Sequence, residues 1–185
     1  MDVVETERLI LRPWKIDDLE SYAKLNADPR VMEFFPSVKT YAESKEEYER
    51  IVAHSEVRKW GLWAVSVKNG SDFIGFIGLR YEDFPSPFTP AVEVGWRLAF
   101  DFWGKGYATE GALASLRYGF TVLYLNEIVS FTPFPNKRSQ RVMEKIGMHH
   151  NSKEDFDHPK LPQGHRLSRH VLYRLSRREW ENPEA

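Results

Sequence analysis

Residues 98–110 read LAFDFWGKGYATE, and they decide the fold of this chain. The segment leaves an apolar strand, passes through Gly104 and Gly106, and runs directly into a helix. Glycines at such a turn let the backbone bend sharply and let a ligand approach bare N–H groups. The first N–H groups of a helix lack intrahelical acceptors, and the helix dipole is positive there. The segment therefore predicts an anion cradle suited to a pyrophosphate.

Two familiar phosphate cradles are excluded. The Walker pattern needs four residues between its glycines and a Gly-Lys-Ser/Thr ending, whereas here the glycines flank one lysine. The dinucleotide fingerprint needs a third glycine three residues on, but Gly111 comes five residues after Gly106. An ordinary strand-to-helix turn, with glycine used only for geometry, stays open as an alternative.

Hydrophobic patterning outward from this segment predicts a mixed order of strands and helices. One helix carries Leu19, Tyr22 and Ala23. A second is opened by a capping box, either Thr40 with Glu43 or Ser44 with Glu47, and ends near Gly61. Strands are expected at residues 8–12, 62–67, 73–79, 91–98, 127–132 and 169–175, and further helices at 109–120 and 137–146. This order predicts an α+β fold with a mixed sheet.

Composition narrows the class of protein. The chain has 185 residues, 42% of them hydrophobic, with 26 Lys and Arg against 27 Asp and Glu and no Cys. We expect one domain over residues 1–185, without disulfides, thiolate zinc sites or a Cys nucleophile. The net charge of −1 disfavours nucleic acid and anionic membrane as partners. With no apolar run of about 20 residues and no leader-like start, a cytoplasmic protein is expected, as a monomer or homodimer.

Several segments together resemble the GNAT superfamily of N-acetyltransferases. Residues 103–110 resemble its acetyl-CoA pyrophosphate loop, and the order of the other segments is most similar to the branch that includes the ribosomal-protein N-terminal acetyltransferases. Those segments are ETERLILRP at 5–13, EVGW at 93–96, NKRS at 136–139 and VMEKIGM at 142–148. The resemblance implies a mostly antiparallel sheet, flanked by helices and splayed between its fourth and fifth strands, with acetyl-CoA in the gap.

The resemblance also implies cofactor contacts. It places Trp96 and Leu98 along the pantetheine arm through backbone groups, and Asn136 near the pantetheine or phosphates, although Asn136 also suits a helix N-cap. The loop itself comprises Trp103, Gly104, Lys105, Gly106, Tyr107, Ala108 and Thr109. Two departures stand out: Trp103 occupies a position that is usually polar, and Met143 occupies the position where many relatives have a Tyr general acid.

Acetyl transfer to an amine needs a base, since alkyl ammonium groups are mostly charged at pH 7. Glu93 is the leading candidate because it lies in an otherwise apolar strand. The alternatives are a salt bridge with Arg80 or Arg97, or a solvent-facing position. Ser139 is the candidate general acid for the departing sulfur, which the resemblance implies, although a serine in a first helical turn also serves capping.

Five of the six histidines fall late in the chain, but their spacing fits no zinc pattern, so no metal is expected. In the turn-rich run 156–165, Asp157, His158 and His165 are candidate acceptor contacts or alternative bases. A plain surface loop is the other interpretation.

The expected activity is transfer of an acetyl group from acetyl-CoA to a primary amine of a small molecule or protein N-terminus, by direct attack in a ternary complex. The alternative is a non-catalytic acyl-CoA-binding sensor or assembly module. The identity of the amine is open.

Overall fold

The computed structural model describes residues 1–182. Its strands are β1 (Val4–Glu5), β2 (Leu9–Arg12), β3 (Leu62–Val67), β4 (Gly75–Glu82), β5 (Ala91–Leu98), β6 (Glu127–Pro133), β7 (His149–His150), β8 (Phe156–Asp157) and β9 (Arg169–Ser176). Its helices are α1 (Asp18–Ala27), α2 (Tyr41–Arg58), α3 (Tyr107–Thr121), α4 (Lys137–Lys145) and α5 (Arg177–Glu181), with short 3-10 turns η1 (Phe100–Phe102) and η2 (Ser152–Glu154). None of these described helices is long and apolar enough to cross a bilayer.

The described strands form one sheet in the order β1-β2-β3-β4-β5-β6-β9-β7, with β8 also paired to β9. The ladders from β1 to β4 and those of β9 with its neighbours are antiparallel, whereas β5 and β6 pair in parallel at Glu93 and Val129. The expected α+β class and the mostly antiparallel sheet flanked by helices are confirmed. The chain forms two compact units: the first holds residues 1–79 and 95–114, the second residues 80–94 and the chain from 115 onward.

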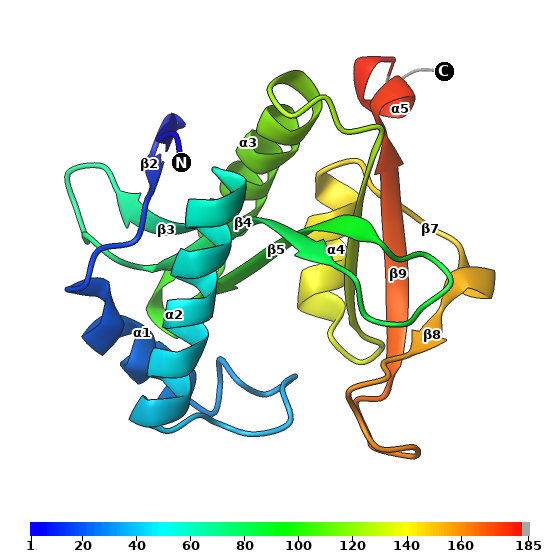
Figure 1. Ribbon diagram of the computed structural model, residues 1–185, viewed down its shortest axis with the longest axis horizontal. Helices are drawn as coiled ribbons and strands as arrows, with labels where there is room; N and C mark the ends of the chain where they lie inside the picture. Colours follow the sequence, from blue (N-terminus) through cyan, green and yellow to red (C-terminus); the bar gives the residue numbers. More distant parts are fainter. Residues whose placement is uncertain (183–185) are drawn as a thin grey trace. The chain divides into compact units, whose positions relative to one another are not determined.

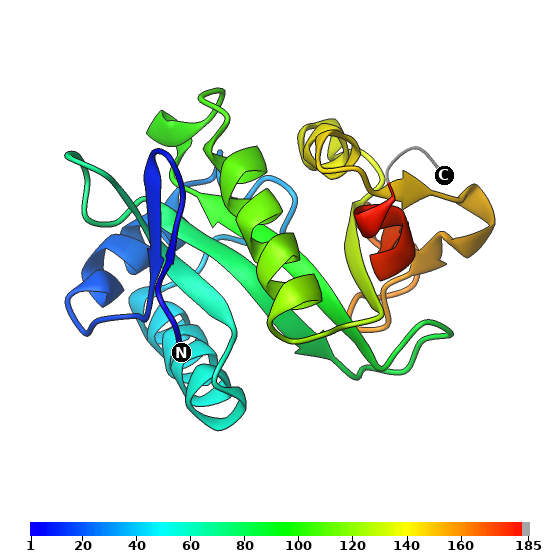
Figure 2. The same ribbon diagram turned by 90° about the horizontal axis from the view of Figure 1, so that it is seen from above.

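In the first unit, helices cover both faces of the sheet. Helices α1 and α2 lie side by side (Figure 1) and bury one apolar cluster against it. This cluster comprises Leu19, Tyr22, Tyr48, Ile51, Leu62 and Phe76. Ile77, the next residue along β4, points to the opposite face. On that face α3 lies across the sheet (Figure 2). The approach is so close that a Cβ on Gly111 would overlap Ile77 Cδ1. Gly111 therefore serves helix-to-sheet packing and is not part of a phosphate fingerprint.

In the second unit, β9 is the central strand (Figure 1). It pairs with β6 from Glu127–Ser176 to Pro133–His170, and with β7 and β8. Paired residues share a face of a sheet and alternate residues along a strand return to it. Since Glu93 pairs with Val129, the side chains of Glu93, Phe131 and His170 lie on one face.

One expectation about element ends is corrected, and one alternative that the sequence leaves open is decided. The strand expected at 73–79 begins at Gly75 and continues to Glu82, so that Arg80 and Glu82 belong to the sheet. Of the two capping boxes, only the first exists: Thr40 Oγ1 accepts from Glu43 N at 3.2 Å and Glu43 Oε2 accepts from Thr40 N at 2.7 Å. Ser44 lies within α2 and is fully buried, and its hydroxyl accepts a hydrogen bond from Asn26.

We predict that Thr40→Ala lowers the free energy of unfolding by about 1 kcal/mol, because one orphan donor at the start of α2 loses its acceptor. Urea denaturation measures the change. Ser37→Ala, at an exposed loop position just before the box, is the matched control and should stay within about 0.5 kcal/mol of the parent. Equal stability of the two variants would contradict the assignment of the cap.

Candidate active site

The glycine loop of the first unit leaves a helix N-terminus open. Gly104 and Gly106 have φ values of +73° and +82°, which residues other than glycine rarely adopt. The first bond of α3 runs from Glu110 N to Gly106 O at 3.0 Å. The N–H groups of Tyr107, Ala108 and Thr109 precede it, and they have no acceptor among the described residues. Three donors at the positive end of the helix dipole can therefore receive an anion.

The side chains beside this loop pack into the first unit. The indole of Trp103 donates to Leu98 O at 2.7 Å and packs against a buried cluster of Leu25, Val31 and Met32. Leu98 is buried and Trp96 is half-buried. Lys105 is exposed, with its ammonium 5.2 Å from the centre of the Phe102 ring. Trp103 therefore stabilises the packing of the first unit, and the backbone of the loop is the part that can contact a ligand.

In the second unit, Glu93 is a buried carboxylate that shares one cation. Its side chain is 10% exposed, and its Oε2 accepts from Arg80 Nη2 at 3.0 Å. Arg80 also forms an ion pair with Glu82 through Nε. Of the alternatives for Glu93, the ion pair with Arg80 is present. Arg97 belongs to the first unit, where its guanidinium binds Asn26 and Glu47.

The surroundings of Glu93 favour its neutral form. Burial raises the pKa of Glu93 most, the Arg80 guanidinium lowers it, and the nearby Glu82 charge raises it again, to a net pKa of about 7. Sequence reasoning identified Glu93 and Arg80 but missed Glu82, because the strand was expected to end at Leu79. A carboxyl group with this pKa can accept a proton near neutral pH.

The start of α4 joins Asn136 and Ser139. Asn136 Oδ1 accepts from Ser139 N at 3.2 Å, so Asn136 is the N-cap of α4. Its amide also donates to Thr132 Oγ1 at 2.9 Å and to Ser139 Oγ at 3.0 Å. Within the described chain the Ser139 hydroxyl hydrogen has no acceptor, so it remains available as a donor. Met143 is 1% exposed and is part of the core.

Two neutral imidazoles lie in an aromatic cluster on the face that carries Glu93. His158 and His170 have ring centres 5.0 Å apart. They pack among Phe84, Phe88, Phe131 and Phe156. Burial and the nearby His170, Lys160 and Arg80 lower the pKa of His158 to about 4, and burial also lowers the pKa of His170. His158 Nδ1 accepts from Lys160 N at 3.2 Å. His170 Nδ1 must donate to Ser168 O at 2.9 Å, since a carbonyl only accepts.

The other acceptor-side candidates do not join this cluster. Asp157 is exposed and lies 3.8 Å from Arg169. His165 Nδ1 accepts from Leu167 N in a local turn. The structure therefore brings His158 into contact with aromatic residues on the face that carries Glu93, but it leaves Asp157 exposed at the end of β8 and His165 in a turn.

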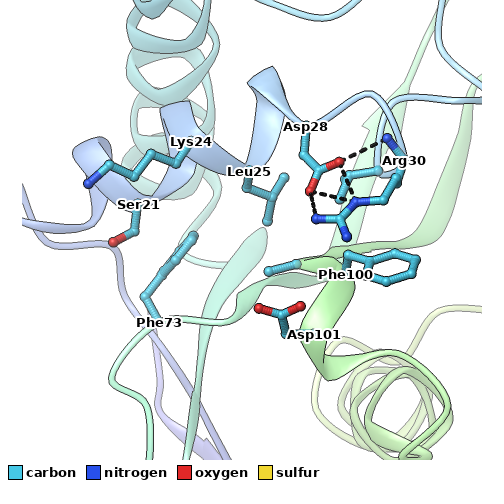
Figure 3. Close-up of a pocket in the computed structure, with 10 residues that line it drawn as sticks. Ser21, Lys24, Leu25, Asp28, Arg30, Phe73, Phe100 and Asp101 are labelled. Atoms are coloured by element: carbon cyan, nitrogen blue, oxygen red, sulfur yellow. Dashed lines mark hydrogen bonds and ion pairs between the residues drawn. The ribbon is translucent and has the colours of Figure 1, made fainter.

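A separate depression of about 240 Å³ lies in the first unit (Figure 3). It is lined by Ser21, Lys24, Leu25, Asp28, Arg30, Val31, Phe73, Ala99, Phe100 and Asp101. Arg30 forms an ion pair with Asp28 at 2.6 Å and stacks 4.1 Å from the centre of the Phe100 ring. None of the residues predicted to act in catalysis or cofactor binding lines this depression, so it is not part of the candidate active site.

Known proteins are similar to this chain in sequence and in fold. The chain is 32% identical over 192 residues to FsC-acetyl coenzyme A-N(2)-transacetylase of Aspergillus fumigatus, covering 96% of this chain and 77% of that protein. The structure of a GNAT-family acetyltransferase from Bacillus anthracis matches with a TM-score of 0.80 and 26% identity, over 96% of this chain and all of that one.

The branch suggested by the sequence is also represented. A ribosomal-protein-S5-alanine acetyltransferase from Vibrio fischeri matches with a TM-score of 0.75 and 19% identity, over 97% of this chain and 99% of that one, which shows a common fold. The family model described as an acetyltransferase (GNAT) domain matches residues 8–149. This match spans well over half of the sequence, and the chain therefore belongs to the GNAT family of acetyltransferases.

Proposed function

We propose that this chain transfers an acetyl group from acetyl-CoA to a primary amine of a small molecule or a protein N-terminus, acting as one domain. The observation that carries the proposal is the open start of α3 behind two glycines with positive φ. The name of the Aspergillus relative includes acetyl coenzyme A and a nitrogen as the acetylated atom, which supports the same reaction class.

In this proposal, the N–H groups of Tyr107, Ala108 and Thr109 hold the pyrophosphate of acetyl-CoA, with Gly104, Lys105 and Gly106 forming the turn before them. Trp96 and Leu98 contact the pantetheine arm through their backbones. Leu98 O already accepts from the Trp103 indole, so Trp96 is the stronger candidate for a carbonyl contact. Asn136 contributes an amide from the start of α4 while it caps that helix.

The reaction is a direct displacement in a ternary complex. Glu93 accepts a proton from the attacking amine, whose nitrogen forms a bond to the acetyl carbon as the carbon–sulfur bond breaks. Ser139 donates a proton to the departing thiolate, directly or through water, and regains one from solvent, while Glu93 releases to solvent the proton that it took from the amine. The Ser139 hydroxyl has the necessary freedom because Asn136 occupies the oxygen as a donor and leaves the hydrogen unused.

We predict saturable binding of CoA and acetyl-CoA by calorimetry, weakened at least about tenfold in Gly104→Val, since a branched residue at positive φ distorts the loop. Gly164→Val is the matched control, because Gly164 also has positive φ (+79°) and open space where a Cβ would lie, but it is not part of the glycine loop. It should bind CoA as the parent does. Absence of binding at millimolar CoA would contradict the proposed function.

We predict that Glu93→Gln lowers kcat by about 10²–10⁴-fold with an accepted amine, because a general base is lost. Thiol release from acetyl-CoA measures the rate. Glu127→Gln, at a more exposed carboxylate of the neighbouring strand β6, is the matched control and should keep the parent rate. Cofactor binding without thiol release over a panel of amines would instead support the non-catalytic sensor.

We predict that the acidic limb of the pH–rate profile falls near pH 7 and moves to lower pH in Glu82→Gln. The Glu82 charge raises the pKa of Glu93, so its removal lowers that pKa, and the basic carboxylate persists to lower pH. Activity below pH 7 should therefore rise relative to the maximum. An unchanged limb in Glu82→Gln would show that Glu93 does not control it.

A further inference from the structure

A carboxylate near the open start of α3 is tied to the first strands of the chain. Glu110 Oε1 accepts from Thr6 Oγ1 at 2.6 Å and from Arg8 N at 2.8 Å, and Glu110 Oε2 accepts from Arg8 Nε at 2.6 Å. More than 100 positions of sequence separate these partners. All three residues belong to the first unit. We call Thr6, Arg8 and Glu110 the Arg8 clasp.

The guanidinium of Arg8 also reaches the glycine loop. Its Nη1 donates to Lys105 O at 2.9 Å, and its Cζ lies 4.8 Å from the centre of the Tyr107 ring. A Cβ built on Gly106 would lie 3.3 Å from Arg8 Nη2. One side chain thus contacts the carbonyl between the two glycines, the second glycine, and the first residue of α3.

Both carboxylate oxygens of Glu110 accept hydrogen bonds within the Arg8 clasp. Arg8 Nε and Nη2 face Glu110, and Nη1 faces Lys105 O. Burial alone would raise the pKa of Glu110, but the hydrogen bonds from Thr6 and Arg8 outweigh it and hold that pKa below its usual value. Glu110 therefore stays ionised and keeps the Arg8 charge neutralised. An arginine held this way fixes the backbone through its hydrogen bond to Lys105 O, and its side chain is 44% exposed.

The loop needs such a support because it contains two glycines. Glycine-rich segments lose much conformational entropy when they become ordered. A loop ordered before a ligand arrives avoids that loss at the moment of binding. The Trp103 indole joins the start of the loop to Leu98 of β5, and the Arg8 clasp joins the glycines to the segment between β1 and β2.

We propose that the Arg8 clasp holds the glycine loop in its anion-receiving shape, so that Arg8 and Glu110 are positioning residues for cofactor affinity. The inference rests on the proposed function in one respect, namely that the anion is the pyrophosphate of CoA. It also explains why ETER at 5–8 and GKGYATE at 104–110 occur in one chain: each supplies one half of the clasp.

The sharpest test is the affinity of Glu110→Gln for CoA by calorimetry. Removing a negative charge beside an anion site should strengthen binding on simple electrostatic grounds. Loss of the clasp predicts the opposite, a weakening of about tenfold, since charge-assisted hydrogen bonds are lost. Arg8→Lys should weaken CoA to a similar degree, because lysine keeps the charge but cannot bridge Glu110 and Lys105 O together.

Arg30→Lys is the matched control. Arg30 forms a similar ion pair with Asp28 in the same unit, and no contact of Arg30 with residues 103–109 is among those of the described chain. Its CoA affinity should stay within about twofold of the parent. In turnover assays, the clasp variants should raise KM for acetyl-CoA and leave KM for the amine unchanged, a split that general destabilisation would not produce.

Amide hydrogen exchange separates this inference from the proposed function. Without any ligand, Glu110→Gln and Arg8→Lys should exchange faster than the parent at residue 110, whose N–H donates to Gly106 O in the loop, while Arg30→Lys should not. Unchanged exchange there, or CoA affinity in Glu110→Gln equal to or above that of the parent, would overturn the role of the clasp. Faster exchange in a parent protein that binds no CoA would confirm the support of the loop and overturn its link to the cofactor.

Discussion

The start of α3 is the constraint around which the first unit is arranged. The first N–H groups of a helix have no acceptor within the helix, and those of Tyr107, Ala108 and Thr109 therefore need a ligand or solvent as their acceptor. Other contacts fix where these groups point. Gly111 lets α3 lie close to Ile77, and the Trp103 indole fastens the chain before the loop to Leu98 O. An anion site of this kind depends on the placement of backbone N–H groups.

Glu93 shows how the number of cations decides the state of a buried carboxyl group. Glu47 in the first unit is half-buried beside an arginine, yet its pKa is lowered: burial raises it, but Arg97, a hydrogen bond from Tyr22, and Lys39 outweigh burial. Glu93 has one arginine and shares it with Glu82, so burial prevails and its pKa is raised. Where two carboxylates share one cation, the pKa of the buried carboxyl group rises, and a raised pKa makes a carboxylate a stronger general base.

Much of the fold could be predicted from local patterns, and the failures have a common cause. The strand 91–98, the N-cap Asn136 and the helix stop before Gly147 depend on residues within a few positions of each other. Strands β7 and β8 have two residues each and exist because β9 offers them a partner, which no local pattern records. For the same reason the two capping boxes looked alike until the contact of Ser44 with Asn26 distinguished them.

The candidate site divides in the same way. The glycine loop and the carboxylate in an apolar strand are visible as sequence patterns, so Gly104, Gly106 and Glu93 could be chosen in advance. The residues that shift the pKa of Glu93 or support the glycine loop could not be chosen in advance, because they are distant in sequence from the residues on which they act. Glu82 acts through an arginine that also pairs with Glu93, and Arg8 reaches Glu110 across about 100 residues. The order of the motifs indicated the family, but it did not predict these contacts.

The raised pKa of Glu93 matches the difficulty of its proposed task. An alkyl ammonium group has a pKa near 10.4, so about 0.04% of it is neutral at pH 7. A carboxylate with the ordinary pKa of 4.5 would take the amine proton at a cost about 3 kcal/mol greater than one with a pKa of about 7. Raising the pKa further would leave little of the base ionised at neutral pH. Burial raises this pKa most, and the charges of Arg80 and Glu82 act on it in opposite directions.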